Sequence, residues 1–159
     1  MSTAINVHAT GLVLGGHGIV VRGASGAGKS LLALSLIERW TRRGSEALLV
    51  ADDRLDLLVI DGQLVMQAPE RISGLIELRG RGIIRRPFVA EAAVGLIVDL
   101  VPDLVRMPDD DAFTTQVLGV SVPRCPVPQA GVVPIEHQML LVEEAMLALP
   151  DAGDHQNTT

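Results

Sequence analysis

The chain has 159 residues, enough for one domain with a sizeable core, and its net charge of −6 and 2% aromatic content argue against nucleic-acid binding. No apolar stretch reaches the roughly 18 residues of a membrane helix, and no secretory signal is visible, so no membrane contact is expected. The single cysteine, Cys125, permits no internal disulfide, which suits a cytoplasmic protein.

The start of the chain predicts a β-hairpin. Residues 7–14 form an apolar run that contains Gly11, and residues 19–21 form a second run after the glycine-rich turn 15–18. His17 lies in that turn, where unusual backbone angles are tolerated. His8, at the start of the first run, is either a half-exposed strand residue or part of a site, and the pattern alone leaves both interpretations open.

A glycine-rich stretch follows the hairpin: Gly23-Ala24-Ser25-Gly26-Ala27-Gly28-Lys29-Ser30. Its spacing, G-x-x-x-x-G-K-S between a strand and a helix, is that of a phosphate-binding loop. The glycines allow backbone N–H groups to converge on a phosphate at the positive end of a helix. Lys29, the only lysine in the chain, is expected to reach the outer phosphates, and the Ser30 hydroxyl to bind Mg²⁺.

An acidic pair follows the next strand. A helix is predicted over residues 31–40 with Gly44 as its C-cap, and the apolar run 47–51 is typical of a buried strand that ends at Asp52 and Asp53. A phosphate-loop site needs one carboxylate near Mg²⁺ and a base near the phosphoryl acceptor. The alternative is a turn in which both aspartates accept backbone N–H groups. Asp99, after the run 94–98, is a rival acid, although a structural role within its strand is favoured.

The middle of the chain carries a hairpin and a basic segment. Strands 55–60 and 63–67 flank Asp61-Gly62, a strong two-residue turn signal. Five of the thirteen basic residues lie between Arg71 and Arg86. This segment is either a solvated basic loop or a set of arginines on glycine hinges that stabilise a transferring phosphoryl group. Hairpins on both sides of the first helix predict a mixed sheet.

The last third of the chain predicts further strands and one helix. Residues 89–101 have a strand pattern, 108–111 a solvent-facing turn, and 113–122 one or two strands, whereas three prolines between 123 and 128 mark an extended connector. A helix is expected over 135–149, and the tail 151–159 is expected to be disordered. Residues 1–150 would then form a single domain. The apolar face of the last helix comprises Ile135, Met139, Leu140, Val142, Met146 and Leu149.

These pieces together resemble the catalytic, C-terminal domain of bacterial HPr kinase/phosphorylase, in a compact form that lacks the N-terminal domain. The resemblance covers residues 8–84. It is carried by His8, the loop 23–30, Val50-Ala51-Asp52-Asp53-Arg54, and Leu75-Ile76-Glu77-Leu78-Arg79-Gly80-Arg81-Gly82-Ile83-Ile84, which is similar to that family's E-[IL]-R-G-x-G-[IL]-[IL] signature.

The resemblance implies an α/β fold of the P-loop, phosphoenolpyruvate-carboxykinase-like type, with a mixed sheet and antiparallel hairpins. It implies an ATP-dependent serine kinase that acts on the phosphocarrier protein HPr or its nitrogen-branch counterpart, with phosphorolytic removal of the same phosphate in many members. Members of the family form hexamers, which implies a homo-oligomer.

The resemblance also implies roles for individual residues. Asp52 would act as the base toward the serine hydroxyl, and His8 would lie beside it near the phosphoryl group. Ser30, Asp53 and Glu77 would manage Mg²⁺. Arg79, with its loop, would help to close the site.

One departure and two alternatives remain. A family stretch of the type [KR]-P-G-R-N is expected near residues 126–131, where its arginine is missing, and this bears on phosphorolysis and on partner contact. A small-molecule kinase usually has a purely parallel sheet and a late lid with several arginines, but only Arg106 and Arg124 follow residue 86. A regulatory module that senses ATP without transferring phosphate would not need the two adjacent aspartates.

Overall fold

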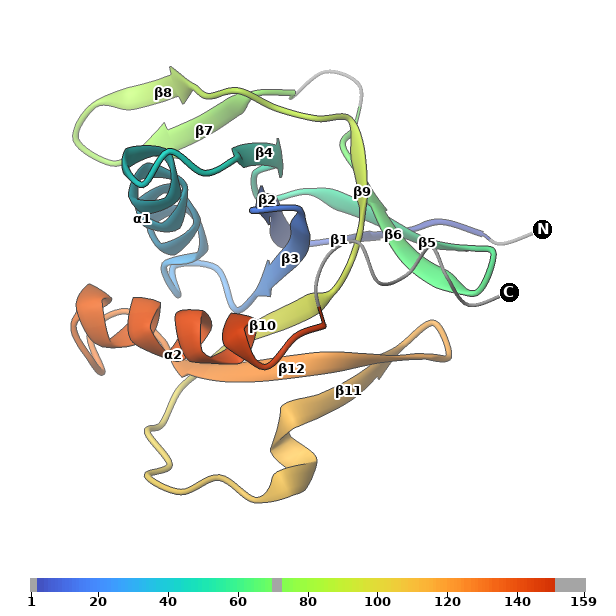
Figure 1. Ribbon diagram of the computed structural model, residues 1–159. Coiled ribbons are helices and arrows are strands. Elements are labelled where there is room, and N and C mark those ends of the chain that lie inside the picture. Colours follow the sequence, from blue (N-terminus) through green and yellow to red (C-terminus); the bar gives the residue numbers. More distant parts are fainter. Residues whose placement is uncertain (1–2, 70–72, 151–159) are drawn as a thin grey trace.

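The computed structural model describes residues 3–69 and 73–150, which form two α-helices, a 3₁₀ helix and three β-sheets (Figure 1). The helices are α1 (Lys29–Arg42), α2 (Ile135–Leu147) and the 3₁₀ helix η1 (Asp110–Phe113). The strands are β1 (Ile5–Val7), β2 (Ala9–Leu14), β3 (His17–Arg22), β4 (Ala47–Ala51), β5 (Leu55–Ile60), β6 (Gln63–Gln67), β7 (Leu75–Leu78), β8 (Gly82–Arg85), β9 (Glu91–Ala93), β10 (Leu96–Val101), β11 (Thr114–Val117) and β12 (Val120–Pro128).

The central sheet has six strands in the order β11-β12-β10-β3-β2-β4. Strands β3, β10 and β12 run parallel, whereas β2, β4 and β11 are antiparallel to their neighbours. The predicted mixed sheet is therefore confirmed. A second sheet has the order β1-β5-β6-β9, and β7 and β8 form a separate hairpin.

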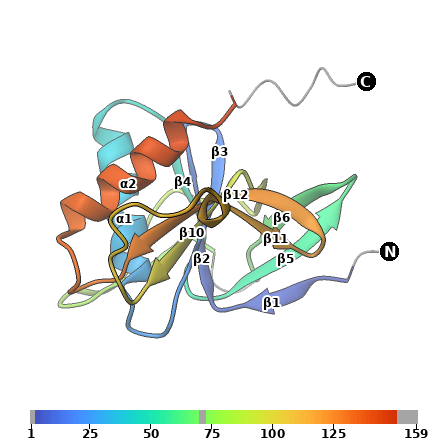
Figure 2. The ribbon, with the colours of Figure 1, turned by 90° about the horizontal axis from the view of Figure 1, so that it is seen from below.

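The central sheet divides the protein into two cores, because successive side chains of a strand point to opposite faces. Leu12 and Ile19 belong to the core that includes α1 and α2, whereas Val13 and Val20 belong to the core that includes β5 and β6. Figure 2 shows both α-helices on one side of the central strands and β1, β5 and β6 on the other. The layers are thus helices, central sheet and four-stranded sheet.

The turns predicted at Asp61-Gly62 and at Gly44 are confirmed, whereas the turn predicted over residues 15–18 is shorter, because His17 and Gly18 belong to β3 and pair with Leu14 and Val13. The β2–β3 hairpin turns at residues 15 and 16, and the β5–β6 hairpin turns at Asp61 and Gly62, which have φ angles of 51° and 78°. Both φ values are positive, as a two-residue type I′ turn requires. Helix α1 ends before Gly44, whose φ of 77° fits the predicted C-cap.

The strand predicted over residues 7–14 is wrong in one respect, because the structure divides it into β1 and β2. A bend at His8 separates them, and β1 pairs with β5 of the second sheet while β2 pairs with β3 and β4. Strand β2 continues through Gly11, although its register with β4 shifts between Gly11 and Leu12. A Cβ at Gly11 would lie 2.7 Å from Met66 Sδ and 2.9 Å from Leu55 Cδ1, so the glycine lets the second sheet pack closely.

The prediction of an extended connector at the prolines between 123 and 128 is also wrong, because these prolines lie within β12. Strand β12 pairs with β10 through residues 124–128. Alternate N–H groups of a strand point to opposite sides, and the Gln129 N–H donates to Val101 O on β10. An N–H group at position 126 or 128 would therefore face away from β10. On that side of β12, strand β11 pairs only with residues 120–123, so the prolines at 126 and 128 remove no hydrogen bond between strands.

Two further segments differ from expectation. The part of the basic segment that is described, residues 73–86, forms the β7–β8 hairpin instead of a loop. On α2, Met139 and Val142 are buried as expected, but Leu140 is 58% exposed. Gln138 is buried instead, and its side-chain amide is satisfied because its Nε2 donates to Pro128 O at 2.8 Å. Arg71 and the tail 151–159 lie outside the described residues.

Replacing Gly18 with alanine is expected to destabilise the fold strongly. A Cβ at Gly18 would overlap the carbonyl oxygen of Ala93, a backbone atom that cannot move aside cheaply. We expect Gly18→Ala to lower the free energy of unfolding by at least about 3 kcal/mol in urea titrations, the upper range for overpacking. Gly95→Ala is the control, because its Cβ would meet only Gly18 O at 3.8 Å. Equal stability of the two variants would contradict this packing.

Candidate active site

The sheet brings three chain segments to one edge. Strand β3 ends there and leads into residues 23–28, strand β4 ends there at Ala51, and β2 begins there. Ala9 pairs with Arg22 and Gly11 with Ala51, so the first residues of β2 lie between the glycine-rich loop and the residues that follow β4. The topology thus places His8, the loop and the aspartate pair at the same edge.

The glycine-rich loop connects β3 to α1 as predicted. Residues 24–26 are exposed at its tip, and α1 begins at Lys29. Gly28 has φ of 97°, and a Cβ there would lie 2.9 Å from Ala130 Cβ, so this position requires glycine twice over. The first N–H groups of α1 have no partner within the helix and carry its positive dipole end, which favours a bound anion.

Lys29 is the first residue of α1, and its side chain turns back toward the loop. Its side chain is 6% exposed, and its Nζ donates to Gly23 O at 3.0 Å and to Ala24 O at 3.2 Å. The same Nζ lies 4.0 Å from Asp53 Oδ1. The charge is therefore held between the loop and the aspartate pair.

Asp52 accepts hydrogen bonds from three different segments. Ser30 Oγ donates to its Oδ1 at 2.6 Å, Thr10 Oγ1 donates to the same oxygen at 3.0 Å, and the Glu77 N–H donates to its Oδ2 at 3.3 Å. Helix α1, strand β2 and strand β7 are thus joined through one carboxylate. Its contact with Ser30 places an acid beside the hydroxyl at the end of the glycine-rich motif.

Asp53 has a different environment. Its side chain is 66% exposed, and its backbone has φ of 65°. Its N–H donates to Thr10 Oγ1 at 3.2 Å, while the Arg54 N–H donates to Asp52 O at 2.8 Å. The two aspartates therefore point to different partners: one carboxylate is engaged by donors, and the other faces solvent near Lys29.

The other expected residues lie around this pair with fewer contacts. His8 is exposed at the bend before β2, and Arg79 is exposed in the turn between β7 and β8. The Glu77 side chain is exposed, and it is the backbone of Glu77 that contacts Asp52. Within the described part of the chain, the Arg79 guanidinium has no hydrogen-bond partner.

Thr10 is the site residue that the sequence analysis missed. It is fully buried and contacts both aspartates. The available signal was a polar residue in the otherwise apolar run 9–14, two positions after His8.

The segment with the missing arginine does lie beside the loop. The Ala130 N–H donates to Ala27 O at 3.0 Å, directly after β12. The two residues that make this contact, Ala27 and Ala130, have small side chains, and neither is an arginine. Leu31, Ala130, Val132 and Ile135 line a shallow cavity there.

Asp99 takes the structural role that was favoured for it. Arg22 binds its carboxylate through two hydrogen bonds of 2.7 and 2.8 Å, and Arg124 Nε donates to it at 2.6 Å. Burial alone would raise the pKa of Asp99, but the two arginines outweigh it and hold the pKa below its usual value of 3.8. This ion cluster ties β3, β10 and β12 together just before the glycine-rich loop.

Removing the Asp99 charge is expected to make the fold less sensitive to acid. Because the folded-state pKa is lowered, the cluster stabilises the fold above about pH 4, and this contribution is lost as pH falls through the folded value. We expect Asp99→Asn to lower the free energy of unfolding at pH 7 by about 2 kcal/mol. The difference from the wild type should shrink below pH 4 in urea titrations. A difference that grows on acidification would contradict this assignment.

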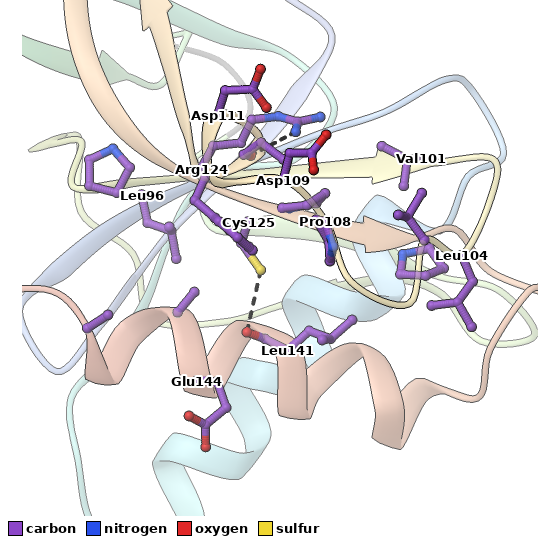
Figure 3. Close-up of a pocket in the computed structure, with 18 of the residues that line it drawn as sticks. Leu96, Val101, Leu104, Pro108, Asp109, Asp111, Arg124, Cys125, Leu141 and Glu144 are labelled. Carbon is purple, nitrogen blue, oxygen red and sulfur yellow. Dashed lines mark hydrogen bonds between the residues drawn. The ribbon is translucent and has the colours of Figure 1, made fainter.

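A cavity of about 750 Å³ lies away from the glycine-rich loop. Figure 3 shows it between β12, α2 and the segment 101–113, with Leu104, Pro108 and Leu141 on its walls. Cys125 lies on this wall and its Sγ donates to Leu141 O at 3.4 Å. None of residues 23–30 lines the cavity, so it is separate from the site described above.

The Cys125 thiol is expected to be unreactive in the folded protein. Burial raises the pKa of this thiol to about 12, so almost no thiolate exists at pH 8. A disulfide reagent such as DTNB should therefore react at least about 100-fold more slowly with the native protein than in 6 M guanidinium. Equal rates in the two states would show that this wall of the cavity opens to solvent.

A strand, a glycine-rich loop and a helix, with an acid against the serine of the loop, define a phosphate-loop domain. The family model described as HPr Serine kinase C-terminal domain matches residues 1–149. The chain therefore belongs to this family.

Individual relatives agree with the family match. The HPr kinase/phosphorylase of Clostridium acetobutylicum is 34% identical over 134 residues, which covers 77% of this chain and 42% of that protein. The HPr kinase/phosphorylase of Clostridium beijerinckii is 44% identical over 78 residues, covering 49% of this chain and 24% of that protein. The chain thus spans less than half the length of these relatives.

A solved structure shows the same fold. The HPr(Ser) kinase/phosphatase from Coxiella burnetii matches with a TM-score of 0.69 and 32% identity, covering 90% of this chain and 97% of that one. The expected P-loop fold of the phosphoenolpyruvate-carboxykinase-like type is confirmed. No helix in residues 3–69 and 73–150 has the length and apolar character needed to cross a membrane.

Proposed function

We propose that residues 1–150 act as a single kinase domain that transfers the γ-phosphoryl group of ATP to a serine of an HPr-type phosphocarrier protein. The observation that carries this proposal is the 2.6 Å hydrogen bond between Ser30 and Asp52, which joins the phosphate loop to the acidic end of β4. The names of the Clostridium and Coxiella relatives supply the substrate class.

The donor set fits a magnesium ion that is bound together with a nucleotide. Among the described residues, no three His, Cys, Asp or Glu side chains converge as in a metal site made by protein alone. Mg²⁺ bound to ATP needs only one or two protein oxygens, since phosphates and waters complete its shell. The Ser30 hydroxyl and the Asp52 carboxylate supply such oxygens at one place. When bound, the ion neutralises charge on the phosphates.

The contacts favour an exchange of the roles that the family resemblance implied for the two aspartates. Asp52 has three donors on its carboxylate, including the hydroxyl that would bind the metal, and it has little freedom to receive a substrate. Asp53 is 66% exposed and 4.0 Å from Lys29 Nζ. We therefore assign Asp52 to the metal side and Asp53 to the base, which accepts the proton of the serine hydroxyl as its oxygen attacks phosphorus.

The remaining residues complete the site around this pair. Lys29 and the first N–H groups of α1 bind the phosphates, which lowers the repulsion that the attacking oxygen meets. His8 borders the same edge, and Arg79 on the β7–β8 turn is free to approach the phosphoryl group. Glu77 acts through its backbone N–H on Asp52, with its carboxylate available to a metal-bound water.

The reverse reaction would use the same groups. A protonated Asp53 would return its proton to the serine oxygen while inorganic phosphate takes up the phosphoryl group, which gives pyrophosphate. The segment 126–131, which lacks the family arginine, lies against the loop through Ala130. Forward transfer is accordingly the activity that the site supports best.

We also propose that the protein acts in the cytoplasm as a homo-oligomer, with a hexamer as the expected form. Light scattering coupled to gel filtration measures this state directly. A monomer at micromolar concentration would contradict the proposed oligomer but would not affect the kinase proposal.

The kinase proposal is tested by incubating the protein with Mg-ATP and an HPr-type phosphocarrier and measuring acid-stable phosphoserine by mass spectrometry. We expect Asp53→Asn to lower the rate by about 10²- to 10⁴-fold, the usual contribution of a general base, with the affinity for ATP retained. Asp61→Asn, in the exposed β5–β6 turn, is the matched control and should behave as the wild type.

Other outcomes separate the alternatives. ATP binding without transfer to any phosphocarrier supports a sensing module, and transfer to a metabolite supports a small-molecule kinase. Transfer by Asp53→Asn at the wild-type rate, together with a complete loss in Asp52→Asn, would restore the roles that the resemblance implied.

A further inference from the structure

Thr10 is placed to hold the two aspartates apart. Its side chain is fully buried at the start of β2, and its hydroxyl is both a donor and an acceptor. Oγ1 donates to Asp52 Oδ1 at 3.0 Å and accepts from the Asp53 N–H at 3.2 Å. One hydroxyl thus contacts the side chain of the first aspartate and the backbone of the second.

We propose that Thr10 is a positioning residue that fixes which of the two adjacent carboxylates faces Ser30 and which faces the acceptor. Its effect on turnover rests on the proposed function, whereas its effect on metal-dependent nucleotide binding does not require phosphoryl transfer. Thr10 itself does not touch the reacting atoms. It acts through Asp52 and Asp53.

The backbone at Asp53 explains why a support is needed. Asp53 has φ of 65°, and the Arg54 N–H donates to Asp52 O two residues earlier, which closes a tight three-residue turn. Turns of this kind are rare and strained for a residue with a side chain. The hydrogen bond from the Asp53 N–H to Thr10 opposes relaxation of the turn.

The direction of the hydrogen bonds also fixes Asp52. Since the threonine hydroxyl has one proton and donates it to Asp52, it can only accept, through its lone pairs, from the Asp53 N–H. The Ser30 hydroxyl approaches the same oxygen of Asp52. If the turn relaxed, Asp53 would leave its place beside Lys29 and compete with Asp52 for the serine.

A structural role alone predicts a different pattern of effects. Thr10 is buried in the central sheet, so any replacement that disturbs packing lowers stability. The loss of a positioning hydroxyl, by contrast, lowers turnover. It also lowers the gain in nucleotide affinity that Mg²⁺ gives, while the affinity for the nucleotide without metal stays the same. The loop 23–28 and Lys29, which bind the phosphates, have no hydrogen bond to Thr10.

The test compares Thr10→Val, which keeps the shape and removes the hydroxyl, with Thr10→Ser, which keeps the hydroxyl. Thr115→Val is the matched control, because Thr115 is a half-buried strand residue on β11. Three quantities are measured for each: kcat and KM for ATP with the phosphocarrier, the affinity for a fluorescent ATP analogue with Mg²⁺ and with EDTA, and the thermal unfolding midpoint.

We expect Thr10→Val to lower kcat by about 10- to 100-fold, the range for losing a hydrogen bond to a charged group, with KM for ATP within about twofold. The gain in nucleotide affinity on adding Mg²⁺ should fall by a similar factor, while the affinity in EDTA is unchanged. Thr10→Ser should recover at least about a third of the wild-type kcat. Thr115→Val should match the wild type in every measurement.

Two results would overturn the proposal. The first is a Thr10→Val protein with wild-type kcat and Mg²⁺ dependence, and the second is a Thr10→Ser protein as impaired as Thr10→Val. If Thr10→Val does not fold, Thr10→Ala takes its place in the same comparison. If the wild type transfers no phosphate to a phosphocarrier, the proposed function fails, and the affinities with Mg²⁺ and EDTA still decide the role of Thr10.

Discussion

The carboxylate of Asp52 accepts hydrogen bonds from three segments that are far apart in the chain, and the arrangement of the site depends on it. Ser30 brings the start of α1, Thr10 brings β2, and the Glu77 N–H brings the β7–β8 hairpin. A charged acceptor makes each of these bonds stronger than one between neutral groups. The phosphate loop, the sheet edge and the hairpin are thus held in one geometry around a single group.

The sheet makes this convergence possible. Strands β3 and β4 end at the edge where β2 begins, because β2 lies between them and runs antiparallel to both. In a purely parallel sheet every strand would end at this edge, so no strand could begin between the loop and the acid. The Arg22–Asp99–Arg124 cluster then ties the end of β3 to β10 and β12 on one side, while β2 pairs with β3 on the other, so the strand that leads into the loop is held on both sides.

Features with a local cause were predicted from the sequence. The phosphate loop, the strand 47–51, the turn at Asp61-Gly62 and the cap at Gly44 each depend on residues within a few positions of one another. The family signature added the order of the site segments. These signals were sufficient for the fold class and for the edge of the sheet at which the site lies.

Features that depend on distant partners could not be predicted in this way. The division of residues 7–14 at His8 follows from the pairing of β1 with β5 and of β2 with β4, strands that begin about fifty and about forty residues further along the chain. The prolines of β12 are tolerated because of where β10 and β11 lie. The different contacts of Asp52 and Asp53 involve Thr10, which lies 42 and 43 positions earlier in the chain, and adjacent carboxylates look equivalent in a sequence.

A crystal structure with Mg²⁺ and a non-hydrolysable ATP analogue tests the central claim most directly. The account predicts that Ser30 Oγ binds the ion, that Asp52 stays on the metal side, bound to the ion or to one of its waters, and that the Asp53 carboxylate faces the terminal phosphate. A structure in which Asp53 enters the metal shell and Asp52 faces the terminal phosphate would contradict it.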